Sequence, residues 1–398
     1  MKNFFLSIIL LLFFGCNPSS KENSDTSEVK IDKPGVSAHD FLIVDTHIDL
    51  PYRLAFESGP VDITKDLPLG HFDYVKAKNG GLDVAFMSIY TPPSEEGIKG
   101  FNTANQLIDI VDSISVNYPE YFDKVVSPEE VLSNRESGII SLPLGLENGS
   151  PINNDLSNLD HFYNRGIRYI TLCHFKSNEI CDSSTDIDQP HGGLSNFGFK
   201  VVEKMNDLGI MIDVSHVSDE TISDVLKASK APIIASHSGC RSLTPSFPRN
   251  LPDSLLVGIR KNGGVIMVNF GSIFLNDISS SNFMKIYDII EDEGLEVGSD
   301  EAELLMTKLL NQYPVESSLS DILDHIDHVV KIAGIDHVGF GSDFDGVSNL
   351  PKEIQSVADY PLIIEGLQNR GYTNDEINKI CGKNFMRVWN AVSKSKGI

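Results

Sequence analysis

Apolar and polar positions alternate in blocks along the chain from Phe41 onward. Eight short apolar runs are separated by amphipathic stretches, and they occupy residues 41–47, 82–90, 138–147, 167–174, 209–216, 231–237, 264–270 and 337–343. The runs are almost continuously apolar and rich in β-branched residues. They therefore predict strands that are buried on both faces, as in a parallel sheet.

The stretches between these runs have the spacing of amphipathic helices, for example at residues 198–209, 218–230 and 319–334. Several begin with Ser or Asp and end with Gly, which are typical helix-capping residues. Eight strand–helix units predict an α/β fold whose strands close into a (β/α)8 TIM barrel. An open, doubly wound sheet is the alternative, but it would not bring the ends of so many strands around one ring.

Two further segments add to this barrel. Residues 271–318 form a longer connection after the seventh strand, and we expect this insertion to contribute a lid. The amphipathic stretch at residues 373–394 predicts a C-terminal helix that packs outside the barrel. Residues 41–398 would then form one domain.

The first residues have the order of an export signal. One Lys is followed by about a dozen apolar residues and then by Gly15 and Cys16, a run too short to span a bilayer comfortably. We expect residues 1–16 to be a lipoprotein signal whose cleavage leaves Cys16 lipidated; a simple signal peptide or an uncleaved anchor is the alternative. Residues 17–40 are polar and predict a flexible tether. The protein would be a cell-envelope lipoprotein that faces the periplasm or the exterior and meets the membrane only through its anchor.

Charge and cysteine content exclude some classes of partner and site. The chain has 32 Lys and Arg against 56 Asp and Glu, a formal charge of −24, which argues against binding of nucleic acid because that needs a cationic face. The remaining cysteines lack zinc-finger or redox spacing, and we expect them to be mainly buried or free, although three disulfide connectivities stay open. They are Cys173, Cys181, Cys240 and Cys381.

Polar residues stand at the ends of six runs: His47, Glu147, His174, His216, His237 and Asp343. The carboxyl ends of barrel strands meet at one mouth, so these side chains should converge there. Taken singly, each histidine could be a core residue and Glu147 a helix cap. Taken together they indicate a metal site.

The spacing within this set favours two ions. His47 and Asp49 project to the same side of an extended chain and can reach one ion. His216 and His237 follow neighbouring strands, and neutral imidazole is the commonest protein ligand for metals. A buried carboxylate at Glu147 would be costly unless it were paired or metal-bound, and it could give one oxygen to each ion.

Ordered motifs over residues 41 to about 390 carry a family resemblance. They include DTHIDLP, GLENG, GIRYITLCH, APIIASHSGCRSL, PRNLPD and HVGFGSDFDGV. Together they resemble the membrane dipeptidase family of zinc peptidases, also called renal dipeptidase-like, in a bacterial lipoprotein form. The resemblance implies an amidohydrolase-like barrel, two Zn2+ ions per chain and a homodimer. It also implies the ligands: one ion held by His47 and Asp49, the other by His216 and His237, and both bridged by Glu147.

The same resemblance implies roles around the substrate. His174 would face the substrate and stabilise its oxyanion, Arg249 would bind its carboxylate, and Asp343 would shuttle the proton. Asp345 lies two residues further on, and we expect it either to support Asp343 or simply to form a turn.

These roles describe a zinc-dependent dipeptidase in which a metal-bridging hydroxide attacks the peptide bond, with tolerance of a D-residue at the C-terminal position implied by the resemblance. One alternative is another binuclear metal amidohydrolase acting on a cyclic amide or phosphotriester. Those enzymes commonly use an HxH motif and a carboxylated lysine, whereas this chain offers HID and Glu147. The other alternative is a lipoprotein that binds peptides without cleaving them.

Overall fold

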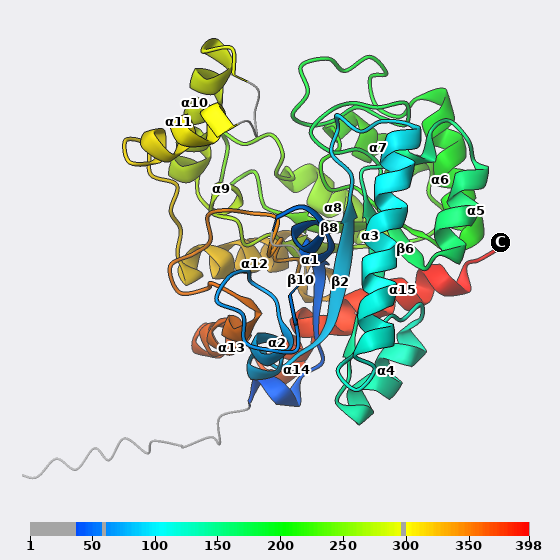
Figure 1. Cartoon of the computed structure of the whole chain (residues 1–398), viewed down its shortest axis with the longest axis vertical. Coiled ribbons are helices and arrows are strands. Elements are labelled where there is room, and N and C mark those ends of the chain that lie inside the picture. The colour runs from blue at the N-terminus through cyan, green and yellow to red at the C-terminus, as the bar shows by residue number, and fades with distance from the viewer. Residues whose placement is uncertain (1–36, 58–60, 296–299, 398) are drawn as a thin grey trace, which may run out of the picture. The chain divides into compact units, whose positions relative to one another are not determined.

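Eight parallel strands close into a barrel in the computed structural model, and Figure 1 shows helices around them. They are β1 (Ile43–Ile48), β2 (Leu82–Tyr90), β5 (Leu144–Glu147), β6 (Ile167–Thr171), β7 (Met211–Asp213), β8 (Ile234–Ser238), β9 (Val265–Val268) and β10 (Val338–Phe340). β1 pairs with both β2 and β10, which closes the ring and excludes the open sheet. The predicted (β/α)8 barrel is confirmed.

The eight apolar runs each contain one barrel strand, and the third run contains an additional short one. Within residues 138–147, β4 (Ile140–Ser141) precedes β5 and pairs with β2 and with β3 (Phe122–Asp123). These two short strands extend the sheet outside the ring.

The structure describes residues 37–57, 61–295 and 300–397. The expected signal at residues 1–16, with Cys16, and nearly all of the expected tether lie outside this part of the chain. Among the described helices, none combines the length and the apolar character needed to cross a membrane. The four cysteines of the barrel domain are buried and free, as predicted.

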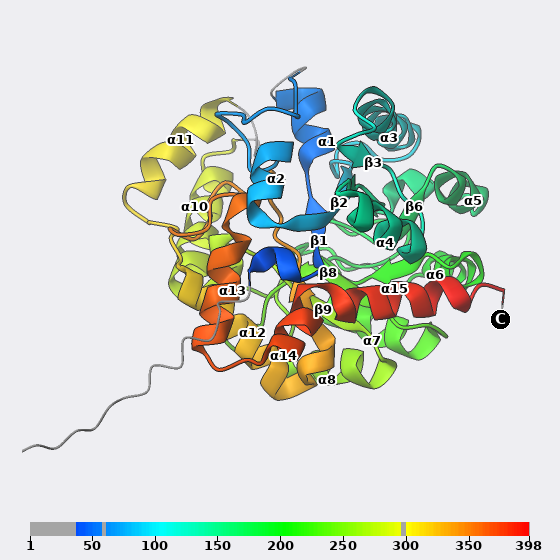
Figure 2. The same ribbon diagram turned by 90° about the horizontal axis from the view of Figure 1, so that it is seen from below.

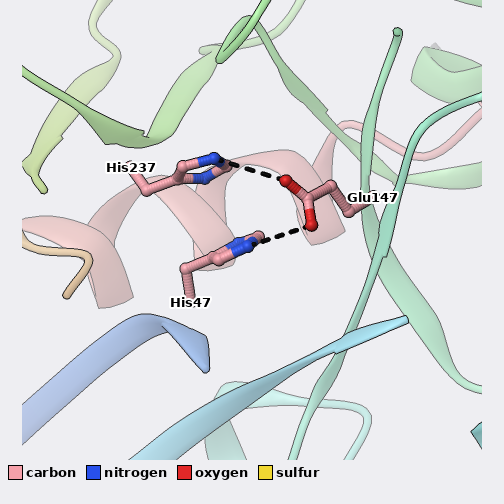
Figure 3. A group of neighbouring side chains, drawn as sticks. All are labelled: His47, Glu147 and His237. Carbon is pink, nitrogen blue, oxygen red and sulfur yellow. Dashed lines mark ion pairs between the residues drawn. The ribbon is translucent and has the colours of Figure 1, made fainter. Parts of the chain in front are cut away.

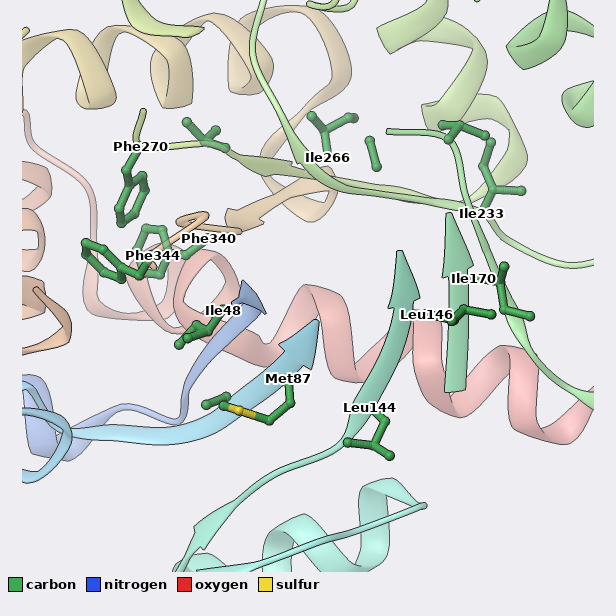
Figure 4. Close-up of a cluster of buried hydrophobic side chains, with 14 of the residues drawn as sticks. Ile48, Met87, Leu144, Leu146, Ile170, Ile233, Ile266, Phe270, Phe340 and Phe344 are labelled. Atoms are coloured by element: carbon green, nitrogen blue, oxygen red, sulfur yellow. The ribbon is translucent and has the colours of Figure 1, made fainter. Parts of the chain in front are cut away.

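Buried apolar side chains fill the space between the strands and the surrounding helices. All six residues of β1 are buried, and so are all residues of β5, β6 and β9. Figure 4 shows part of this cluster, to which strands and the loops that follow them both contribute. The near-continuous burial explains why the strands read as apolar runs and not as an alternating pattern.

Helices follow the strands and cover the outside of the barrel. The capping residues act as the sequence predicts: the Ser195 hydroxyl accepts a hydrogen bond from Gly198 N at the start of α6 (Asn196–Leu208), which ends at Gly209 with a φ of 75°. Ser218 caps α7 (Asp219–Ala228) in the same way. The other covering helices include α1 (Leu50–Tyr52), α2 (Tyr74–Gly80), α3 (Ile98–Asn117), α4 (Pro128–Ser137), α5 (Ser157–Asn164), α8 (Asp253–Asn262), α12 (Leu319–Ala333) and α13 (Tyr360–Asn369).

The predicted C-terminal helix is present, with a π-helical turn inside it. α14 (Asn374–Asn378) leads into the π-helical segment Lys379–Lys383 and then into α15 (Asn384–Lys394). At this turn a Cβ on Gly382 would lie only 2.5 Å from the Leu42 carbonyl oxygen. Glycine is therefore required where the helix meets the chain just before β1.

α15 lies across one end of the barrel (Figure 2). Its buried face includes Phe385 and Trp389, whose rings lie 5.1 and 5.2 Å from the ring of Phe86. The same cluster contains Val44 and Val265, which stand at the starts of their strands. The helix thus closes the amino-terminal end of the barrel, and the carboxyl ends of the strands are left to form the site.

Replacing Trp389 by Ala is expected to lower the free energy of unfolding by about 3–5 kcal/mol, because the indole is fully buried and its loss leaves a cavity. Urea unfolding measures the change. Phe199→Ala, at a ring that is 43% exposed, is the matched control and should cost much less. Equal losses for the two variants would mean that α15 does not seal the barrel.

The insertion after β9 contains α9 (Ser272–Leu275), α10 (Asp277–Asp292) and α11 (Asp300–Leu310). Figure 1 shows α10 and α11 side by side, in yellow. They share a small apolar cluster of their own, formed by Ile286, Ile290, Ala302 and Val315. The insertion thus carries its own core in addition to the core of the barrel.

Candidate metal centre and active site

The polar strand ends converge at the mouth opposite α15. His47 and His237 lie within β1 and β8, and Glu147 is the last residue of β5. Three further side chains come from loops that directly follow β6, β7 and β10: His174, His216 and Asp343. The structure therefore brings together the side chains that the strand pattern places at one mouth.

Glu147 lies at the centre of this group. Its Oε2 is 3.3 Å from His47 Nε2, and its Oε1 is 3.2 Å from His216 Nε2. His237 Nε2 and His174 Nε2 are each 3.4 Å from the same Oε1. Figure 3 shows His47 and His237 pointing at the two oxygens of the carboxylate. One carboxylate thus faces histidines on two sides, as a bridging ligand must.

Three overlapping sets of side chains could each hold a cation, with ligand atoms within 4.8 Å of one another. They are His47, Glu147 and His237; Glu147, His174 and His216; and His47, Asp49 and Asp343. The five predicted ligands all belong to these sets. His174 and Asp343 belong to them as well, so both stand as close to the candidate metal positions as the predicted ligands do.

The tautomer of His47 suits a metal ligand. The Tyr169 hydroxyl donates its single proton to Thr46 O at 3.0 Å, so it accepts from His47 Nδ1, which lies 2.9 Å away. The neutral form of the ring, which a bound metal ion requires, would present an unprotonated Nε2 to Glu147 and Asp49. Within the described part of the chain this buried nitrogen has no hydrogen-bond partner, and a lone pair that faces two carboxylates calls for a cation between them.

His237 is oriented by a similar chain of hydrogen bonds. Ser236 Oγ donates to Asp213 Oδ2 at 2.6 Å, so it accepts from His237 Nδ1 at 2.8 Å. The unprotonated His237 Nε2 is therefore aimed at Glu147. A carboxylate that orients a histidine through its other ring nitrogen is a usual arrangement around protein-bound metals.

Electrostatics give the centre an excess of negative charge. Burial raises the pKa of Asp49 well above its usual value, and the charges of Glu147 and Asp343 raise it further. Burial would lower the pKa of His47, but the charges of Glu147 and Asp49 outweigh this effect and raise that pKa to about 10. Burial lowers the pKa of both His216 and His237, which keeps these rings neutral and able to bind a metal. The donor set fits a cationic cofactor.

Two site residues have an unusual backbone conformation. His216 and Asp343 adopt φ values of 72° and 66°, in the left-handed region that residues other than glycine seldom occupy. Asp343 is held there by a hydrogen bond from its N–H to His47 O at 3.1 Å and by Asn269 Nδ2, which donates to its Oδ2 at 2.8 Å. These contacts keep its other oxygen directed at the group that includes His47 and Asp49.

Asp345 belongs to a different set of contacts. Its Oδ2 forms an ion pair with Arg53 Nε at 2.9 Å, and its Oδ1 accepts a hydrogen bond from His71 N at 2.6 Å. It also has a positive φ, of 67°. Asp345 thus lies in the turn that carries Asp343 and ties that turn to the segment after β1, whereas its support of Asp343 in catalysis stays a prediction.

Arg249 is more enclosed than its predicted role suggests. It is 2% exposed; Nη1 donates to Ser238 Oγ at 2.9 Å and Nη2 donates to His237 O at 2.8 Å. Its Cζ lies 5.4 Å from the centre of the Phe274 ring. Phe274 lines the pocket at the mouth and Arg249 does not. Arg249 thus supports the strand end that carries His237. Its guanidinium lies beside the ring of Phe274, which lines the pocket.

A pocket of about 450 Å3 opens onto the candidate metal centre. Asp49, Glu147, His174, His216 and Asp343 line its floor, and residues of the insertion line it as well. The insertion therefore lies where a lid would have to be. A volume of this size is typical of sites for small molecules.

The sequence interpretation missed the residues that orient the metal ligands: Tyr169, Asp213, Ser236 and Asn269. Each is a polar residue inside or directly after an otherwise apolar run, so the sequence does hold a signal. It does not reveal their partners, because Tyr169 reaches His47 across 122 residues.

Replacing Tyr169 by Phe is expected to weaken metal binding at this centre by roughly 10-fold to 100-fold, because the variant loses the acceptor that fixes the His47 tautomer. Competition with a chromogenic chelator measures the affinity. Tyr163→Phe is the control: the Tyr163 hydroxyl accepts a hydrogen bond from Lys396 Nζ, away from the metal centre. This variant should bind the metal as the wild type does. An unchanged affinity in Tyr169→Phe would show that this hydrogen bond does not orient the ligand.

Comparison with known proteins agrees with this geometry. Residues 37–397 match the family described as membrane dipeptidase (peptidase family M19). An uncharacterised dipeptidase of Schizosaccharomyces pombe is 32% identical over an alignment of 372 residues, and the match covers 87% of this chain and 79% of that protein.

Two solved structures are similar along nearly the whole chain. The probable dipeptidase PvdM from Pseudomonas aeruginosa is 29% identical with a TM-score of 0.80, and the match covers 90% of this chain and 97% of that one. Dipeptidase AC, a metallopeptidase of family M19, is 25% identical with a TM-score of 0.74, covering 90% and 99%. The similarity extends over the barrel and the site together.

Proposed function

Because this chain belongs to the membrane dipeptidase family, peptidase family M19, we propose that it is a zinc-dependent dipeptidase with two metal ions per chain. The observation that carries the proposal is the position of Glu147, one carboxylate that lies within 3.4 Å of the Nε2 atoms of four histidines. A structural carboxylate has no need of so many imidazoles, whereas a shared metal ligand does.

Five side chains would hold the ions: His47 and Asp49 on one side, His216 and His237 on the other, and Glu147 between them. Zinc at such a site would lower the pKa of a bound water molecule to about 7 and polarise a substrate carbonyl. The chain contributes carboxylates that balance the charge of the ions, and the neutral imidazoles of His216 and His237, whose pKa values burial has lowered.

His174 and Asp343 would act on the reacting groups. His174 Nε2 lies at the floor of the pocket beside Glu147, where it can donate a hydrogen bond to the oxygen on which negative charge develops. Asp343 is held by Asn269 through one oxygen, and its carboxylate can take a proton at the nucleophile and deliver it to the departing amine.

Arg249 would give the enzyme its preference for substrates with a free carboxylate. Burial lowers its pKa to about 10, which leaves the guanidinium charged at neutral pH. Its charge favours the carboxylate of a dipeptide on the β8 side of the pocket. We include tolerance of a D-residue next to that carboxylate, which comparison of L-Ala-D-Ala with L-Ala-L-Ala would test.

The N-terminal segment would place the enzyme at the cell envelope, anchored through a lipidated Cys16, and two chains would form a homodimer. Mass spectrometry of the mature N-terminus and sedimentation of the tether-free protein test these two points. An unmodified N-terminus upstream of Cys16, or a monomer at micromolar concentration, would contradict them.

Hydrolysis of a dipeptide panel tests the proposed function. The purified chain should hydrolyse dipeptides, lose activity after treatment with a chelator and recover it when zinc is restored. It should leave tripeptides with blocked C-termini, cyclic amides and phosphotriesters intact. A protein that binds zinc and cleaves none of the dipeptides would overturn the proposal.

A further inference from the structure

The pocket has one polar part and one apolar part. The polar side chains that line it include the candidate metal ligands Asp49, Glu147 and His216, and Glu57, which follows β1. The apolar lining comes mainly from six residues of the insertion, Ile273, Phe274, Phe283, Ile286, Met306 and Leu310, and is completed by Phe175, Val347 and the rings of Tyr52 and Tyr90. These six side chains serve no purpose in the metal chemistry, yet they enclose the same cavity.

The apolar wall is built largely from α10 and α11, which pack against each other through a shared apolar cluster. On α10, Phe283 and Ile286 are three residues apart, and on α11, Met306 and Leu310 are four apart, so each pair lies on one side of its helix. The same residues take part in the insertion's own cluster, because Ile286 is one of its buried members and Phe283, Met306 and Leu310 pack against it. The wall is therefore a preformed surface and can select a substrate by shape and polarity.

Charge indicates which part of a dipeptide meets this wall. The Phe274 ring lies 5.4 Å from Arg249 Cζ, so the apolar wall begins beside the buried cation that favours the substrate carboxylate. Glu57 lies on the segment after β1 and favours the protonated α-amino group. The residue that carries the carboxylate is thus the one whose side chain points at the insertion.

We infer that the insertion forms a specificity subsite for a bulky apolar side chain on the C-terminal residue of the dipeptide. The inference rests on the proposed function and narrows its substrate class. A cavity of about 450 Å3 leaves room for such a side chain beside the scissile bond. Its removal from water against six apolar side chains would favour Leu or Phe over Gly and over charged residues.

Two dipeptide series test the wild-type enzyme. In the series Ala-Gly, Ala-Ala, Ala-Leu and Ala-Phe, kcat/KM should rise by on the order of 10-fold to 100-fold from the first member to the bulky members. In the series Gly-Ala, Leu-Ala and Phe-Ala the change should be clearly smaller. Activity on dipeptides without a preference in the first series would overturn the inference while leaving the proposed function intact. Absence of any dipeptide hydrolysis would overturn the proposed function itself.

A pair of variants on α11 tests the wall directly. Met306→Glu places a carboxylate in the subsite, and it should lower kcat/KM for Ala-Leu by roughly 10-fold or more and raise it for Ala-Lys relative to Ala-Leu. Leu304→Glu makes the same change in charge on the same helix, at a side chain that is 61% exposed and does not line the pocket. It should keep the wild-type preference. Equal selectivity in the two variants, with both folded by circular dichroism, would show that the wall does not contact the substrate.

Discussion

Glu147→Gln is expected to reduce kcat for dipeptide hydrolysis by far more than roughly 100-fold. A loss of roughly 100-fold is the upper range for a residue that only supports a metal ligand. The amide keeps the shape of the side chain and can keep its contact with Ser88, but it lacks the negative charge that two cations would share. Zinc content should fall below two ions per chain. Metal analysis together with steady-state kinetics measures both effects.

Ser88→Ala is the matched control for this variant. Ser88 Oγ donates to Glu147 Oε2 at 3.0 Å, so the substitution removes a hydrogen bond and leaves the carboxylate in place. We expect both zinc ions to remain and kcat to fall by no more than roughly 100-fold, the upper range for such a supporting contact. If Glu147→Gln kept two ions and an activity like that of Ser88→Ala, Glu147 would not be a bridging ligand.

Asp343→Asn is expected to lower kcat by roughly 100-fold to 10,000-fold, the range for loss of a general acid or base. Asparagine fits the same turn, since it tolerates a positive φ, but it cannot carry the proton. The five proposed ligands are untouched, so zinc content should stay near two ions per chain.

Asp345→Asn makes the same chemical change two residues away and should act mainly on stability. It removes the charge of a side chain whose ion pair with Arg53 is buried, and breaking such a pair typically costs about 3–5 kcal/mol of the free energy of unfolding. Thermal unfolding of the two variants separates the roles. A loss of kcat in Asp345→Asn as large as that in Asp343→Asn would contradict the assignment of the proton shuttle.

The sequence predicts the barrel well because parallel strands buried on both faces leave a simple pattern. All eight apolar runs contain a barrel strand, and the polar residue at the end of each of six runs reaches the mouth. The His47–Asp49 spacing could be interpreted from strand geometry alone. The centre is therefore encoded locally, one strand end at a time.

What the sequence does not reveal depends on distant contacts and backbone turns. His216 has a left-handed backbone conformation, which usually favours glycine. The surrounding sequence VSHVS contains no glycine that would indicate this conformation. The burial of Arg249 depends on Phe274 from the insertion, 25 positions further on, and the orientation of His47 depends on Tyr169 from another strand. Similarly, amphipathicity predicts the helix at residues 373–394, but it does not show that α15 closes the end of the barrel.

The site at the strand ends and the insertion after β9, which carries its own apolar core, would have separate roles. Residues at the strand ends determine the chemistry, and the insertion helices determine which side chain the pocket accepts. Changes in α10 and α11 can then alter selectivity without disturbing the ligands, because loops and insertions tolerate substitution more readily than the strands do.

Anomalous diffraction at the zinc absorption edge from crystals of residues 37–398 is the most direct test of the metal centre. If Glu147 bridges two zinc ions, we expect two peaks per chain. One should lie beside His47 and Asp49 and the other beside His216 and His237, with Glu147 in contact with both. A single peak, or peaks away from Glu147 in protein supplied with excess zinc, would contradict it.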